Sequence, residues 1–166
     1  MKSRAELEIQ ARRYLISTSG DVNSFRFLGD GTDGAVWTTN RGTAVKAYQS
    51  IRGYANERDS YERLAAFGIT EKIAGFWIPA IVGWNDEIMA IEMDFMQDPP
   101  YIVDFAKVRI DRPPDFPEDV LRQAEAQGRE QFGRNWPRVK GLMAELESYQ
   151  IYYLDPKPSN IVFPPD

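Results

Sequence analysis

The chain of 166 residues is long enough for one domain, or for one domain divided into two small lobes, and 43% of its residues are hydrophobic. Its 20 Lys and Arg against 25 Asp and Glu give a net charge of −5, which argues against a general nucleic-acid binder. The absence of cysteine excludes disulfides and thiolate zinc sites, and the absence of histidine excludes the Ser-His-Asp triad and histidine general bases. Any chemistry must therefore use carboxylates, lysines, amides and hard cations such as Mg²⁺.

The elements follow from the spacing of apolar residues and from turn-forming residues. In the first half of the chain, the sequence predicts a helix over residues 3–17, three strands between 24 and 48, and a helix over 54–67 that ends at Gly68. Two strands follow between 78 and 96, with a turn at Asn85-Asp86. The second half is predicted to contain a connector over 98–117 with one short element near 101–108, and helices over 118–132 and 137–150. No apolar run approaches the length of a transmembrane helix and the first residues lack the apolar core of a signal peptide. We therefore expect a cytoplasmic protein without a membrane partner.

Three glycines, Gly29, Gly31 and Gly34, have the spacing of a phosphate-binding loop. A strand-like segment follows them, so they are expected at a hairpin tip and not at the start of a dinucleotide-binding helix. Without Cβ atoms, such residues let backbone amides approach phosphates, although an ordinary turn is an equal alternative. The neighbouring carboxylates of Asp30 and Asp33 would repel a triphosphate and weaken its binding.

Lys46 lies in a β-prone segment after these glycines, on the strand face opposite Val45. From that face it can reach phosphates held by the glycine-rich turn. On the next predicted helix, Glu57 shares one face with Tyr61 and Leu64 and is expected to pair with Lys46. A solvated strand lysine and a solvated helix carboxylate are the alternatives.

The most specific signal is the loop Asp155-Pro156-Lys157-Pro158-Ser159-Asn160, which is stiffened by prolines and leads into a short apolar strand. Asp155 can accept a proton from a substrate hydroxyl, Lys157 can neutralise a transferring phosphoryl group, and Asn160 can ligate a cation. The alternative is a proline-rich turn with Asn160 as a turn former.

Over about residues 24–163, these segments in this order resemble the eukaryotic-type (Ser/Thr) protein kinase family. The matching segments are Gly29–Trp37 for the glycine-rich loop, Thr43–Lys46 for the strand with the phosphate lysine, the helix with Glu57 for αC, Ile91–Met96 for the strand entering the hinge, and Tyr153–Ile161 for the catalytic loop. The Lys157-Pro158 pair is closer to protein kinases than to aminoglycoside-type small-molecule kinases.

The resemblance implies a protein kinase-like α+β fold. Residues 1–96 would form an N-lobe with a five-stranded antiparallel sheet and one αC-like helix, and residues 97–166 a reduced helical C-lobe. It also implies a site for ATP. Gly29, Gly31 and Gly34 would cover the phosphates, and Lys46, held by Glu57, would bind them. Val36 and Ala44 would lie above the adenine, backbone groups of Asp94, Phe95 and Met96 would lie beside it, and Asp155 and Lys157 would be the catalytic pair.

Two departures from the family bear on activity. Tyr153-Leu154-Asp155 replaces the family's His-Arg-Asp, and the sequence ends shortly after Asn160, before the position of the family's Asp-Phe-Gly segment. A truncated member is therefore expected, with a weak or incomplete Mg²⁺ site in which Asn160 is the clear protein ligand. Two functions follow: transfer of the γ-phosphoryl group of ATP to a protein hydroxyl, or a catalytically inactive pseudokinase that binds a protein partner. A third alternative is an interaction protein with an empty cleft, whose binding surface would be the apolar faces that a complete lobe covers; such faces also favour a homodimer.

Overall fold

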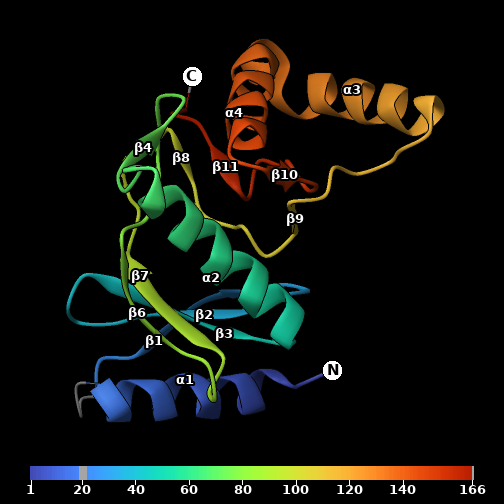
Figure 1. Ribbon diagram of the computed structural model, residues 1–166. Helices are drawn as coiled ribbons and strands as arrows, with labels where there is room; N and C mark the ends of the chain where they lie inside the picture. The colour runs from blue at the N-terminus through green and yellow to red at the C-terminus, as the bar shows by residue number, and fades with distance from the viewer. Residues whose placement is uncertain (19–21, 166) are drawn as a thin grey trace.

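The computed structural model describes residues 1–18 and 22–165, and its α+β architecture has two parts (Figure 1). One part is a five-stranded antiparallel sheet with the strand order β1-β2-β3-β7-β6. Its strands are β1 (Arg26–Asp30), β2 (Gly34–Thr38), β3 (Thr43–Tyr48), β6 (Ile81–Asn85) and β7 (Ala90–Asp94). The predicted α+β fold class with a five-stranded antiparallel sheet is confirmed.

The two faces of this sheet are covered by different helices. Helix α1 (Arg4–Thr18) packs on β2, β3 and β7 and buries the leucines of its apolar stripe against Val45 and Ala47. Because side chains alternate along a strand, Lys46 and Tyr48 face the opposite side of β3, toward α2. The strand pattern therefore separates the hydrophobic core under α1 from the polar residues on the other face.

Helix α2 (Ile51–Ala66) crosses that second face (Figure 1). Its N-cap is Ser50, whose side chain accepts a hydrogen bond from the Gly53 amide at 3.2 Å. The predicted start at residue 54 was wrong by three residues, because Ile51 and Arg52 are exposed and the spacing of apolar side chains begins only at Tyr54. The predicted end is confirmed, since Gly68 has φ +77° and its amide donates to the Ala65 carbonyl.

The second part contains two helices and short strands around the largest hydrophobic core. Its elements are β4 (Lys72–Ile73), β5 (Phe76–Trp77), β8 (Tyr101–Ile102), β9 (Val108–Ile110), α3 (Glu118–Phe132), the 3₁₀ helix η1 (Gly133–Asn135), α4 (Trp136–Ser148), β10 (Ile151–Tyr153) and β11 (Ile161–Val162). Helix α4 packs on β10, whereas α3 projects outward and buries only Gly128 and Phe132 (Figure 1). Among the helices of the described ranges, none is both long and apolar enough to cross a membrane.

The segment predicted as a connector contains two strands, β8 and β9, rather than one short element. Strand β8 pairs antiparallel with β11, and β9 pairs antiparallel with β10. Residues that precede α3 and α4 in the chain therefore run beside residues that follow these helices. Two backbone hydrogen bonds complete the arrangement, from the Val103 amide to the Asn160 carbonyl and from the Leu154 amide to the Lys107 carbonyl. The loop between β8 and β9 consequently lies against the loop between β10 and β11.

Candidate functional site

A cleft of about 350 Å³ lies between the glycine-rich β1–β2 turn and the second part of the molecule. Ten of the residues proposed from the sequence line it: Gly29, Gly31, Gly34, Val36, Ala44, Lys46, Asp94, Met96, Lys157 and Asn160. The other two lie next to it. Glu57 lies behind Lys46 and contacts its ammonium, and Asp155 contacts the ammonium of Lys157. The fold thus brings the predicted residues together from five segments of the chain.

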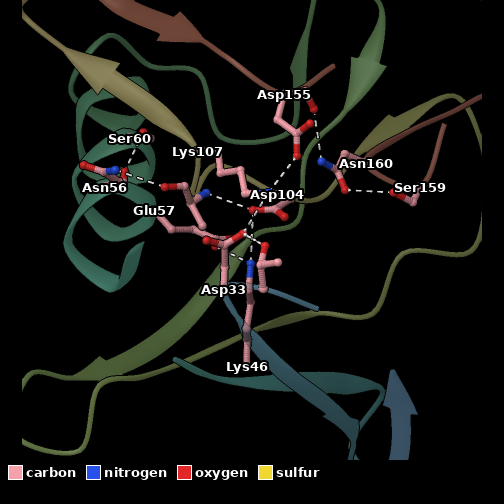
Figure 2. A network of polar contacts seen from close by, with 12 residues as sticks. Asp33, Lys46, Asn56, Glu57, Ser60, Asp104, Lys107, Asp155, Ser159 and Asn160 are labelled. Atoms are coloured by element: carbon pink, nitrogen blue, oxygen red, sulfur yellow. Dashed lines mark hydrogen bonds and ion pairs between the residues drawn. The ribbon is translucent and has the colours of Figure 1, made fainter. Parts of the chain in front are cut away.

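Lys46 has two carboxylate partners at the back of the cleft, as Figure 2 shows. Its Nζ lies 2.5 Å from Glu57 Oε2 and 3.2 Å from Asp104 Oδ1. The Glu57 side chain is completely buried and the Lys46 side chain is 9% exposed. The predicted pairing of Lys46 with Glu57 is present, and it connects β3 to α2.

The charges of this pair depend on burial and on the contacts. Burial opposes the charge of Lys46, but the carboxylates of Glu57 and Asp104 outweigh it and raise the pKa of Lys46. Burial also raises the pKa of Glu57 to about 7, against the lowering effect of Lys46. The second oxygen of Glu57, Oε1, and the Tyr48 hydroxyl have no hydrogen-bond partner within the described residues. Lys46 is therefore a cation at neutral pH, whereas the Glu57 carboxyl gains and loses its proton close to neutral pH.

Asp104 is a site residue that the sequence analysis missed. It follows β8, and its Oδ1 accepts hydrogen bonds from Lys46 and from the Ala106 amide. Its carbonyl accepts a 2.6 Å hydrogen bond from the hydroxyl of Tyr153 in β10. The available signal in the sequence was the β-prone run Tyr101-Ile102-Val103, which ends in Asp104-Phe105 and precedes the loop with Asp155.

Phe105, which follows Asp104, fixes this loop in the core. Its ring lies edge-on to Tyr61 of α2 at 5.1 Å between centroids and to Tyr153 of β10 at 6.0 Å. Such edge-to-face pairs add to the free energy gained by burial. Phe105 thereby holds the Asp104 carboxylate in register with both α2 and the segment that carries Asp155.

The Asp155 carboxylate lies between two ammonium groups. Its Oδ2 is 3.0 Å from Lys157 Nζ and 3.1 Å from Lys107 Nζ. Burial raises the pKa of Asp155, but hydrogen bonds from Lys157 and Lys107 outweigh it and hold that pKa below its ordinary value. The carboxylate is therefore ionised at neutral pH, as a proton acceptor must be. Asn160 stabilises the loop by donating from Nδ2 to the Asp155 carbonyl at 3.2 Å.

Glycine occupies positions 29, 31 and 34 around the β1–β2 turn for different structural reasons. A Cβ on Gly34 would lie 2.1 Å from the Ala47 carbonyl oxygen of β3, so the sheet itself requires glycine there. A Cβ on Gly29 or Gly31 would meet nothing within 4 Å. The Gly31 amide donates to the Gly34 carbonyl at 2.9 Å and closes the turn. Space for a ligand thus exists at Gly29 and Gly31, beside the cleft.

The predicted hinge at Asp94–Met96 has one amide left for a ligand. The Asp94 amide donates to the Ala80 carbonyl, and the Phe95 amide donates to the Gly42 carbonyl. The Met96 amide has no hydrogen bond to the described part of the chain. A ligand at this segment could therefore receive a backbone amide hydrogen bond from Met96.

Oxygen ligands for a cation are few but suitable in kind. Within the described residues, no group of three or more His, Cys, Asp or Glu could hold a metal ion. Asp104 and Asn160 line the same cleft, and the backbone hydrogen bond between Val103 and Asn160 keeps their segments adjacent. Mg²⁺ is typically bound by one or two protein oxygens, with the remaining positions filled by phosphate oxygens and water. The residues present fit such a cation only together with a phosphate ligand.

No protein-family model and no curated protein sequence matches the chain. Some solved structures have a similar chain trace. One is APH(2'')-IIa in a ternary complex with streptomycin and ATP, with 14% identity, 96% of this chain and 43% of that chain covered, and a TM-score of 0.45. Another is the complex of APH(2'')-IIa with gentamicin, with 16% identity, 92% of this chain and 41% of that chain covered, and a TM-score of 0.47. A third is the aminoglycoside phosphotransferase APH(2'')-Ib with ADP bound (15%, 92%, 42%, 0.45). The chain spans about two fifths of the length of these solved chains. At such identities and TM-scores, the function of this chain must be inferred from its own site.

Proposed function

We propose that the protein is a phosphotransferase that binds ATP and transfers its γ-phosphoryl group to a hydroxyl. The observation that carries the proposal is the position of the Lys46 ammonium, which contacts Glu57 and Asp104 at the back of a cleft. The glycine-rich turn and the loop with Lys157 and Asn160 line that same cleft. A buried cation beside a glycine-rich turn suits the phosphates of a nucleotide.

The proposed nucleotide orientation follows from the polarity of the cleft. Its apolar end, lined by Val36, Ala44 and Met93, suits the adenine ring, and the free Met96 amide supplies a polar contact there. Its charged end, at Lys46, suits the phosphates. Leu in place of Ala44 would fill the adenine end, and we expect it to abolish nucleotide binding.

Asp104 and Asn160 would hold Mg²⁺ at the charged end. Asp104 would then be the principal metal-binding aspartate. The family resemblance gives this role to the aspartate of Asp-Phe-Gly, which follows the catalytic loop, whereas Asp104 precedes Asp155 in this chain. Its Oδ2 has no hydrogen bond to a described residue, so it can face a cation while Oδ1 stays with Lys46. When bound, the cation would offset phosphate charge.

The transfer itself requires few protein groups. The acceptor hydroxyl gives its proton to Asp155, its oxygen bonds to the γ-phosphorus, and the bond between that phosphorus and the bridging oxygen of ADP breaks. Lys46 and Lys157 neutralise the phosphate oxygens. Phosphoryl transfer depends mainly on such positioning and charge neutralisation.

Nucleotide binding and transfer can be tested with one set of variants. At ATP concentrations ten times its dissociation constant, linkage stabilises the fold by about 1.4 kcal/mol, which raises the melting temperature by about 3–6 °C. We expect Lys46→Ala to remove this shift, Asp104→Asn to remove the gain in ATP affinity caused by Mg²⁺, and Asp155→Asn to keep the shift but abolish transfer. If millimolar ATP and ADP leave the wild-type melting curve unchanged, the proposal is wrong.

The acceptor separates two versions of the proposed function. The Lys157-Pro158 pair favours a protein hydroxyl, through the resemblance to protein kinases. Incubation with radiolabelled ATP and, in parallel, a mixed protein substrate or gentamicin would identify the acceptor. Label on protein that requires Asp155 supports a protein kinase activity, and label on gentamicin supports a small-molecule kinase. ATP binding without label on any acceptor, including water, would instead favour the inactive partner-binding module.

A further inference from the structure

Lys107 lies between the glycine-rich turn and the proposed base, and the proposed function gives it no role. Its Nζ is 3.1 Å from Asp155 Oδ2 and 3.6 Å from Asp33 Oδ2 (Figure 2). The three side chains are between 23% and 36% exposed, so they are only partly accessible to solvent. One ammonium group therefore connects the β1–β2 turn to the loop between β10 and β11, beside the cleft.

The position of Lys107 is fixed by its backbone. Its carbonyl accepts a hydrogen bond from the amide of Leu154, next to Asp155. The Asn56 side chain of α2 donates to the carbonyls of both neighbours, Ala106 at 3.0 Å and Val108 at 3.2 Å. The Lys107 side chain thus starts from a segment held by both α2 and β10, and its reach toward Asp33 does not depend on a mobile surface loop.

The place of the Asp33 carboxylate is the place expected for a terminal phosphate. A transferring phosphoryl group must lie under the glycine-rich turn and close to the proton acceptor, which is the space that Lys107 spans between Asp33 and Asp155. A carboxylate is the protein group most similar to phosphate oxygens as a partner of an ammonium. A γ-phosphate that pairs with Lys107 on the side of the β1–β2 turn would lie against the Asp33 carboxylate, and these two anions would repel each other.

We propose that Lys107 is a ligand of the terminal phosphate of ATP and that Asp33 takes the place of that phosphate when no nucleotide is bound. This inference rests on the proposed function. ATP binding exchanges the contact of Lys107 with Asp33 for one with the γ-phosphate, whereas ADP leaves the contact with Asp33 in place. The pair therefore selects a nucleoside triphosphate over a diphosphate.

Titration calorimetry of ATP and ADP, each with Mg²⁺, tests the role of Lys107. Lys107→Met should weaken ATP binding about tenfold and change ADP binding less than about twofold, and Lys107→Arg should restore ATP binding. Lys140→Met is the matched control, because Lys140 is similarly exposed and pairs with Glu125 outside the cleft. Equal losses for ATP and ADP in Lys107→Met would overturn the inference and leave the proposed function intact. Absence of wild-type binding to either nucleotide would overturn both.

The role of Asp33 is tested against Asp30, the other carboxylate of the turn. Asp33→Asn should tighten ATP binding about threefold and leave ADP binding unchanged. Asp30→Asn removes the same charge without a contact to Lys107, so it should change the two affinities in parallel. If Asp33→Asn also acts equally on ATP and ADP, Asp33 contributes only general repulsion and the inference fails. Melting curves of the variants without nucleotide control for loss of folding.

Discussion

Glu57 is held by a contact on one side only. Oε2 is bonded to Lys46, while Oε1 is buried without a hydrogen-bond partner among the described residues. A buried carboxyl oxygen without a hydrogen bond favours the neutral form of the acid, because moving the neutral form out of water costs less free energy than moving the ionised form. The same carboxylate that orients Lys46 for phosphates therefore costs stability when it is ionised, and both effects are measurable.

The pH dependence of stability tests this account of Glu57. Its pKa is raised from 4.5 to about 7, so the folded chain binds more protons than the unfolded chain between these values. The free energy of unfolding contributed by this group is thus highest below about pH 4.5 and falls as the pH rises toward 7. Relative to Glu57→Gln, the wild type should lose about 1–3 kcal/mol across this window. Urea unfolding of both proteins at several pH values measures the difference, and parallel curves would contradict it.

At the scale of the element, the β1–β2 hairpin contains glycines of two kinds. Gly34 has no room for a side chain, whereas a Cβ on Gly29 or Gly31 would meet no other atom within 4 Å. Gly34→Ala places a methyl group against the backbone of β3, and we expect a loss of about 1–3 kcal/mol in stability. Gly31→Ala meets no atom within 4 Å and should change stability by less than about 0.5 kcal/mol. Thermal unfolding of the two variants checks this contrast. Equal destabilisation would mean that the turn is constrained at both glycines.

The elements that the sequence predicts well are those whose pattern is local. The helix expected over residues 118–132 is α3 with the same bounds, and the Lys46–Glu57 contact followed from strand alternation and helical spacing. Near residues 101–108 the sequence predicts one short element where the structure has strands β8 and β9, because two or three residues carry no measurable period and the partners β11 and β10 lie beyond α3 and α4 in the chain. Asp104 was missed with them, since its place in the site is created by that non-local pairing.

At the scale of the molecule, α2 joins cores that would otherwise be separate. Tyr61 and Leu64 belong to the large core around α4, whereas Tyr54 belongs to a small cluster on the sheet face. A third cluster lies between α1 and the other face of the sheet. Because one rigid helix contributes to the cores on both sides of the cleft, we expect the two parts to unfold together.

Cooperative unfolding can be tested with one substitution in each outer core. Leu7→Ala removes buried contacts under α1 and Leu142→Ala removes them beside β10, and both side chains are at most 2% exposed. Each should lower the free energy of unfolding by about 2–5 kcal/mol and shift a single transition seen equally by circular dichroism and tryptophan fluorescence. The two sites share no core cluster, so the effects should add to within about 0.5 kcal/mol in the double variant. Two separate transitions, with each substitution moving only one, would show that the parts on either side of the cleft fold independently and that α2 does not couple them.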